Sequence, residues 1–154
     1  MAPSAHARPP ATRTPLPATP PPLATPSSRQ AVSELTAAER AACPARAMAC
    51  VNVGAKLAWL QHDGVLSYGP VPIATGRPGL ETPRGTFTVL RKYVHHVSSY
   101  YGQPMPYSVF FTDYGIAFHE GPLDTSSHGC VHLTRTAAPK FYAALAYGDE
   151  VVVA

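Results

Sequence analysis

The sequence predicts a mainly antiparallel β domain with one packed helix. From residue 50 onward, short runs alternate between apolar and polar residues, and turn residues such as Asp63-Gly64 separate them. In this part of the chain a helical pattern occurs once, near the end. Thr136 can cap that helix, Pro139 falls in its first turn, and Gly148 ends it. Many short strands with a single helix indicate the β class.

The first part of the chain has a different composition. Nine of its 18 prolines lie before residue 27, and residues 1–30 contain no acidic residue and no Phe, Trp or Tyr. Such a segment cannot bury enough apolar area to offset the entropy of ordering it. We therefore predict a disordered Pro/Ala-rich linker over 1–42, within which 31–42 can form a short helix with Ser33 as its N-cap. One globular domain follows over 43–154.

The alternating runs give the order of the strands. If the run over 86–94 is extended throughout, Phe87, Val89 and Arg91 lie on one face of a single strand. The expected strands are 51–54, a hairpin over 56–69, 71–76, 86–94, two strands within 105–121, and 150–154.

Charge and hydropathy exclude two classes of partner. The net charge is +3, and the Arg and Lys residues are scattered rather than gathered into a stripe with stacking aromatics, so we expect no nucleic-acid partner. No uninterrupted apolar run approaches the length of a membrane span, and the N-terminus lacks the apolar segment of a signal peptide. The chain is therefore either cytosolic or exported by a signal outside this sequence.

Cysteine spacing favours export. Six residues separate Cys43 from Cys50, whereas Cys130 stands alone. A Cys43–Cys50 disulfide with one free thiol is the economical interpretation, and such a bond persists in an oxidising compartment. Two buried reduced cysteines are the alternative. We expect an extracytoplasmic protein whose export signal is not present in this chain.

The stretch "AFHEGPLDTSSHGCVHL", residues 117–133, concentrates the side chains that can carry chemistry. Its four candidate zinc ligands are His119, His128, Cys130 and His132. In an extended segment the last three project to one face at intervals of roughly 6.5 Å, which is too long for adjacent ligands of one ion unless the chain turns at Gly129. No second cysteine pair has zinc-finger spacing, so we expect no metal.

Nucleophilic catalysis explains the same residues better. A thiolate is the attacking species, and a nearby histidine lowers the pKa of the thiol and takes its proton. His119, on a different strand from Cys130, is better placed to be that base than His128. Gly129 lets a substrate carbonyl approach, and N–H groups beside it can bind the developing oxyanion. The plain alternative is packed histidines and an inert buried cysteine.

Several ordered motifs resemble the L,D-transpeptidase catalytic domain, the YkuD-like family of bacterial cell-wall enzymes. "SHGCVHL" (127–133), preceded by "FHEG" (118–121), is similar to the active-site signature of that family. "ATGRPGLETPRGTFTVL" (74–90) resembles its strand, TPxG turn and next strand, and "MPYSVFF" (105–111) resembles the segment that lines its substrate cleft. The resemblance implies a YkuD-like mixed β-sandwich with one packed C-terminal helix.

The resemblance also implies roles for individual residues. Cys130 falls on the nucleophile, and His119 falls on the histidine that activates it. His128 and Gly129 fall where the family places substrate contacts and oxyanion donors, which include the N–H of Cys130. The residues expected to bind substrate are Ser127, Met105, Tyr107, Phe110, Glu120 and His132.

Two of these positions depart from the family pattern. Glu120 stands where Gly or Ser is common, and its backbone carbonyl is expected to hold the ring of His119. A carboxylate beside the base can raise the pKa of His119. His132 stands where Arg or Asn is more frequent, which leaves its role open.

The implied activity is acyl transfer on peptidoglycan without a metal or cofactor. Cys130 would form a thioester with the third residue of a tetrapeptide stem, and the side-chain amine of a neighbouring stem would resolve it into a crosslink between third-position residues. The alternatives are an L,D-carboxypeptidase that hydrolyses the same thioester, and a non-catalytic wall-binding module. Expected partners are peptidoglycan stem peptides and, as covalent inhibitors, carbapenem-type β-lactams.

Overall fold

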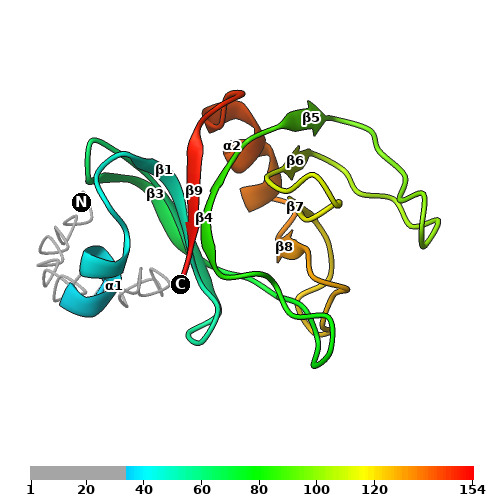
Figure 1. Cartoon of the computed structure of the whole chain (residues 1–154), viewed down its shortest axis with the longest axis horizontal. Coiled ribbons are helices and arrows are strands. Elements are labelled where there is room, and N and C mark those ends of the chain that lie inside the picture. The colour runs from blue at the N-terminus through cyan, green and yellow to red at the C-terminus, as the bar shows by residue number, and fades with distance from the viewer. Residues whose placement is uncertain (1–33) are drawn as a thin grey trace, which may run out of the picture.

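The computed structural model describes residues 34–154. Residues 1–33 of the predicted linker, which include Ser33, lie outside the described residues. Within them the chain forms two β-sheets that face one another, with one helix, α2, between their upper ends (Figure 1). None of the helices in 34–154 is long and apolar enough to cross a membrane.

The larger sheet has the strand order β3-β2-β1-β9-β4. Within it β9 (Glu150–Val153) lies between two strands: it pairs parallel to β1 (Ala47–Asn52) and antiparallel to β4 (Gly85–Thr88). β2 (Leu57–His62) and β3 (Val65–Pro72) form the expected hairpin. Asp63 and Gly64 at its turn both have positive φ, 48° and 77°, as the tight hairpin turn requires.

The smaller sheet has the strand order β5-β6-β7-β8. β5 (Arg91–Tyr93), β6 (Ser108–Phe110) and β7 (Ala117–Glu120) pair antiparallel, and β8 (Val131–Leu133) lies parallel to β7. Because each sheet contains one parallel pair, the domain is the mixed β-sandwich that the resemblance implied rather than a purely antiparallel one.

Helix α2 (Ala137–Ala144) fills the space between the sheets. Phe141 is fully buried, with its ring 5.1 Å from the ring of Phe118 on β7 and 6.1 Å from that of Tyr68 on β3. At the other end of the helix, the Lys92 ammonium donates to the carbonyl oxygen of Tyr142 at 2.6 Å and to that of Leu145. The helix therefore joins both sheets to one core.

The predicted single strand over 86–94 is wrong. The chain leaves the larger sheet after Thr88 and joins the smaller one at Arg91. The amide of Val89 bonds to Asp149 beside β9, and the amide of Leu90 bonds to Phe110 on β6. Alternation of apolar residues cannot reveal such a crossing, since both halves keep the period of two.

The predicted caps of both helices also need correction. The first helix, α1, is Ala37–Ala42, and Thr36 with Glu39 forms its capping box in place of Ser33. In α2, Thr136 makes no capping hydrogen bond; the hydroxyl of Thr134 accepts from the amide of Ala137 at 3.1 Å.

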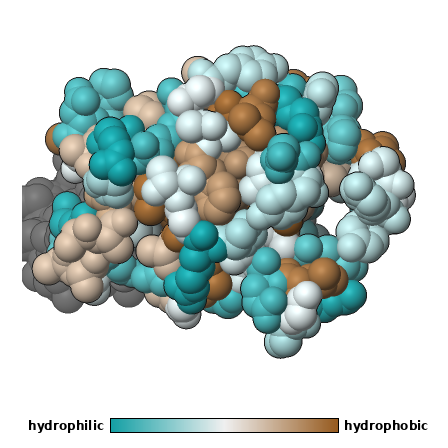
Figure 2. Space-filling view, viewed as in Figure 1, coloured by the Kyte–Doolittle hydropathy of each residue, from teal (hydrophilic) through white to brown (hydrophobic). Residues whose placement is uncertain are grey.

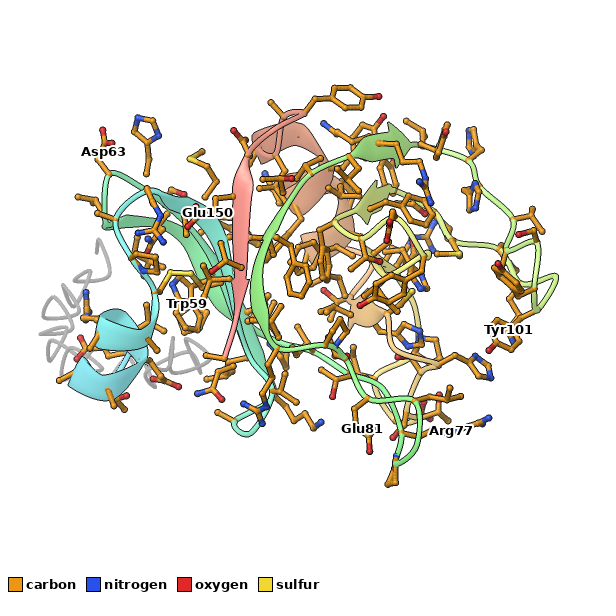
Figure 3. The ribbon with its side chains drawn as sticks, viewed as in Figure 1. Trp59, Asp63, Arg77, Glu81, Tyr101 and Glu150 are labelled. Atoms are coloured by element: carbon orange, nitrogen blue, oxygen red, sulfur yellow. A yellow bond between two sulfur atoms is a disulfide. The ribbon has the colours of Figure 1, made fainter. Side chains whose placement is uncertain are left out.

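The disulfide between Cys43 and Cys50 is present and ties the end of α1 to β1. In Figure 3 it lies beside Trp59, on the side of the larger sheet that faces away from α2. Leu35, Trp59 and Val152 surround the two cysteines in a small core of their own.

Candidate active site

Two parallel strands bring the predicted catalytic side chains together. The pairing of β7 with β8 sets Phe118 beside Val131 and His119 beside His132. Side chains alternate between the faces of a strand, so Cys130, directly before β8, projects to the same face as His132 and therefore as His119. The structure places His119 on the strand next to Cys130, as the sequence analysis expected.

The ring of His119 is held in one orientation. Its Nδ1 lies 2.7 Å from the backbone oxygen of Glu120, and because a carbonyl can only accept, Nδ1 carries the proton and donates it. The lone pair of Nε2 is then free to take a proton. The side chain is buried, and burial lowers the pKa of His119 to about 4, against a smaller rise from the hydrogen bond to Glu120.

The expected rise in the pKa of His119 from the Glu120 carboxylate is wrong. Burial is the largest cause of the shift, and the charge of His132, followed by that of His96, lowers the pKa further. Glu120 acts on the ring through its backbone oxygen. His119 is therefore a neutral imidazole at neutral pH.

Cys130 is the one free cysteine of the described residues and is half-buried. Burial raises the pKa of its thiol above the ordinary 9.0, against a smaller lowering by the backbone N–H of Ala117. The sulfur lies 3.6 Å from the carbonyl oxygen of Gly115, to which it donates. Within residues 34–154 no hydrogen bond joins Sγ to His119. The resting pair is thus a neutral thiol and a neutral imidazole.

The loop 127–130 is folded around its own hydroxyl group. Ser127 is buried; its Oγ donates to the carbonyl of Cys130 at 2.5 Å and accepts from the amide of Gly129 at 3.0 Å. The hydroxyl predicted to bind substrate therefore supports the loop. Gly129 has φ +124°, and a Cβ there would lie 2.6 Å from Cδ1 of Ile116, so this position requires glycine.

Two cavities meet at these residues. The first, of about 350 Å³, is lined by Cys130 together with His119 and Met105. The second, of about 630 Å³, is lined by Glu120 and Arg135, among other residues. Five residues line both cavities: Gln103, His119, Ser127, His128 and His132.

A hairpin arm over 97–104 closes one side of the first cavity. It is joined by a bridge between Val97 and Pro104 and by the bond from the Ser98 amide to the Gln103 carbonyl. Tyr101 on this arm stacks on His128 with centroids 3.7 Å apart and planes 9° apart. Tyr101 stands at the end of the molecule in Figure 3, and the surface in Figure 2 is hollowed beside it.

His132 is packed beside the base. Its ring meets that of His119 edge to face at 4.8 Å, and its Nδ1 donates to the carbonyl of Pro122 at 2.8 Å. A Cβ at Gly121 would lie 2.8 Å from the His132 ring, so glycine there makes room for it. Burial lowers the pKa of His132, against a smaller rise from the hydrogen bond that its ring donates to the carbonyl of Pro122.

The three residues of the predicted cleft segment separate in the structure. Met105 is buried and lines the first cavity. Phe110 packs behind it, against Ala117 and Cys130, and Tyr107 packs edge to face on Tyr142 of α2. Neither Phe110 nor Tyr107 lines either of the two cavities. Both pack behind the residues that do.

The four candidate zinc ligands of the 117–133 stretch were weighed above as an alternative to catalysis. Over residues 34–154, no three His, Cys, Asp or Glu side chains are grouped closely enough to hold an ion.

Comparison with known proteins decides the family. The family model of the L,D-transpeptidase catalytic domain, YkuD, matches residues 46–153. The chain belongs to this family.

Two kinds of relative agree with this. The probable L,D-transpeptidase 3 of Mycobacterium tuberculosis is 35% identical over an alignment of 104 residues, which covers 55% of this chain and 38% of the relative. Among solved structures, an L,D-transpeptidase of Stackebrandtia nassauensis has a TM-score of 0.65 at 30% identity, covering 69% of this chain and 54% of that one. The M. tuberculosis L,D-transpeptidase 3 with a faropenem-derived adduct has a TM-score of 0.60 at 28% identity, covering 68% and 58%.

This L,D-transpeptidase domain therefore spans little more than half, or less, of the length of the relatives it matches. The family is one of acyltransferases.

Sequence analysis missed two residues of the L,D-transpeptidase site. Thr82 is buried, and its hydroxyl donates to the carbonyl of Gly129 at 2.7 Å. Tyr101 forms part of the cavity wall. The TPxG turn was a signal for Thr82, but nothing in the sequence places that turn against residue 129, 47 positions away. Nothing in the sequence around Tyr101 indicated that its ring would line a cavity.

Proposed function

We propose that the chain is a peptidoglycan L,D-transpeptidase in which Cys130 captures an acyl group and His119 moves the protons. One observation supports this most directly: a free thiol and an imidazole line the same cavity from neighbouring strands, and the imidazole has Nδ1 committed to the carbonyl of Glu120. This is the constellation of a nucleophile, a base and a group that orients the base.

The first step is acylation. The thiol of Cys130 attacks the carbonyl carbon of the third stem residue while Nε2 of His119 takes the sulfur proton. The hydrogen bond from Nδ1 to Glu120 stabilises the imidazolium that forms. The C–N bond to the terminal D-alanine then breaks, His119 protonates the departing amine, and a thioester remains on Cys130.

The oxyanion of this step needs backbone donors. The amide of Gly129 is occupied by Ser127, whereas the amide of Cys130 makes no hydrogen bond within residues 34–154. We assign the oxyanion to the Cys130 amide. One such donor contributes about 3 to 4 kcal/mol to the stability of a transition state.

The second step is aminolysis. The side-chain amine of a second stem attacks the thioester, gives a proton to His119, and releases the sulfur as a thiol. His119 and His132 line both cavities, so a donor stem in the first cavity and an acceptor in the second can share one base. This favours transfer over hydrolysis by water, which is the reaction of the carboxypeptidase alternative.

Covalent labelling tests the enzyme against the wall-binding module. A solved relative carries a faropenem-derived adduct, and we propose that faropenem and carbapenems acylate Cys130 here. Intact-mass spectrometry should show one added drug per chain for the wild type and none for Cys130→Ser. His119→Ala should lose most of the labelling rate, and His128→Ala should lose less. Full activity of His119→Ala would mean that another group is the base.

Product analysis tests transfer against hydrolysis. With a tetrapeptide-bearing muropeptide, a transpeptidase forms a crosslinked dimer and free D-alanine, whereas a carboxypeptidase forms tripeptide and free D-alanine. We expect dimer as the main product. Tripeptide alone would assign the chain to the carboxypeptidases. Because the proposed substrate is peptidoglycan, we also propose that the protein acts outside the cytoplasm, in the cell wall or a periplasm-like space. The Cys43–Cys50 disulfide supports this, since such a bond is stable in an oxidising compartment.

A further inference from the structure

The peptide group that joins Gly129 to Cys130 is fixed by a buried threonine from another part of the chain. Thr82 is 3% exposed, and its Oγ1 donates to the carbonyl oxygen of Gly129 at 2.7 Å. Oγ1 of Thr82 in turn accepts a hydrogen bond from the amide of Gly76 at 3.0 Å. The hydroxyl therefore has both its donor and its acceptor function committed, and its position is determined from two sides.

The turn that carries Thr82 is itself locked against the loop. The amide of Arg77 donates to the carbonyl of Ser127 at 3.0 Å, and the amide of Ser127 donates to the carbonyl of Thr75 at 2.9 Å. A Cβ at Gly76 would lie 1.9 Å from the carbonyl oxygen of Leu80, so the turn is closed as tightly as the backbone allows. Arg77 and Glu81 mark its tip in Figure 3.

Fixing one end of a peptide group fixes the other. The Gly129–Cys130 peptide is trans, so its C=O and its N–H point in opposite directions in one plane. With the oxygen held by Thr82 inside the protein, the N–H of Cys130 is turned the opposite way. Gly129 has no side chain that could restrict rotation of this peptide. Its φ of +124° lies in a region of backbone conformation that residues with a side chain rarely adopt.

We propose that Thr82 is a positioning residue for the oxyanion donor: it orients the Gly129–Cys130 peptide so that the Cys130 amide faces the carbonyl under attack. This rests on the proposed function, in which Cys130 is the nucleophile. Ser127 holds the next carbonyl along, that of Cys130, so each peptide flanking the sulfur is fixed by one buried hydroxyl.

The experiment compares two reactions of the same sulfur. Faropenem reacts at a carbonyl and needs the oxyanion donor, whereas iodoacetamide is attacked at its CH₂ carbon and expels iodide without forming an oxyanion. Thr82→Val keeps the shape of the side chain and removes the hydroxyl. We expect acylation of Thr82→Val by faropenem to slow roughly 10- to 100-fold, and alkylation by iodoacetamide to change less than about threefold.

Two further variants control for folding. Thr82→Ser restores the hydroxyl and should recover most of the acylation rate. Thr134→Val removes a hydroxyl that supports helix α2 and not the loop; it should lower stability without changing the ratio of the two rates.

Each outcome bears on one claim. If wild-type Cys130 is not acylated at all, the proposed function fails. If the wild type is acylated and Thr82→Val is acylated at the same rate, Thr82 does not position the donor. Equal slowing of acylation and alkylation would show a general disturbance of the site and would also overturn the inference.

Discussion

At the scale of single residues, burial favours the uncharged forms of Cys130 and His119. Burial raises the pKa of Cys130 and lowers the pKa of His119 to about 4. A thiolate–imidazolium pair would need the opposite shifts. In the proposed reaction, proton transfer to His119 therefore accompanies the attack by Cys130, as in a serine–histidine pair, and does not precede it.

The pH dependence of alkylation checks this resting state. Iodoacetamide reacts with the thiolate, so its rate with Cys130 should rise continuously between about pH 7 and pH 10, because the thiol pKa lies above 9.0. Mass spectrometry of the alkylated protein gives the rate at each pH. A level rate between pH 5 and pH 8 would indicate a preformed ion pair instead.

Acid stability checks the buried imidazole. The folded-state pKa of His119 is about 4, below the ordinary 6.5, so the unfolded chain binds a proton that the folded one refuses. The stability that the neutral ring contributes is present above pH 6.5 and is lost as the pH falls from 6.5 to 4. The loss amounts to roughly 3 kcal/mol at pH 4.

Urea unfolding of the wild type and of His119→Asn at pH 7 and pH 4 measures this loss. The asparagine variant cannot gain a proton, so its stability should fall less over the same range. Equal losses in the two proteins would show that the ring is not held neutral.

At the scale of elements, two short segments brace the active-site loop and the core. The turn 76–82 holds the loop 127–130 through backbone and hydroxyl bonds. Helix α2 joins the sheets, with Thr134 at its start and Lys92 of β5 at its end. Both braces connect residues far apart in the chain, which makes them sensitive to the register of the strands that carry them.

The cap of α2 offers a matched pair of substitutions. Thr134 accepts from the amide of Ala137, whereas Thr136 makes no capping bond. Thr134→Ala should lower the free energy of unfolding by about 1 kcal/mol, and Thr136→Ala should change it by a few tenths at most. Urea denaturation at pH 7 measures both. A larger effect at Thr136 would return the cap to the residue that the sequence pattern favoured.

At the scale of the whole molecule, the disulfide and the candidate active site lie at opposite ends of the domain. The disulfide, Leu35 and Trp59 form a small core beyond the larger sheet, and the two cavities open around the smaller sheet and the 97–104 arm (Figure 3). The main core lies between them.

Removing the disulfide tests this separation. The bond links residues seven positions apart, and closing a loop of that length stabilises the folded state by roughly 2 kcal/mol. Cys43→Ala with Cys50→Ala should lower the melting temperature accordingly. The rate of faropenem acylation, measured well below the melting temperature, should stay within about twofold of the wild type. A large fall in that rate would show that the disulfide core positions the distant site.

The sequence by itself determined the class of the fold, the Cys43–Cys50 disulfide, and the placement of His119 on the strand beside Cys130. These depend on local alternation, on cysteine arithmetic and on a motif whose members lie within 12 positions of each other. The hairpin at Asp63-Gly64 is equally local, since two residues with positive φ suffice to form it.

Only the tertiary structure decided the rest. The crossing of 86–94 between sheets, the burial that sets the pKa of His119, and the bond from Thr82 to Gly129 all arise from contacts between distant segments. A pKa depends on how much water remains around a group, and the orientation of a peptide depends on what lies beyond its oxygen. Neither the pKa nor the peptide orientation can be predicted from neighbouring residues in the sequence, because both depend on residues that only the fold brings into contact.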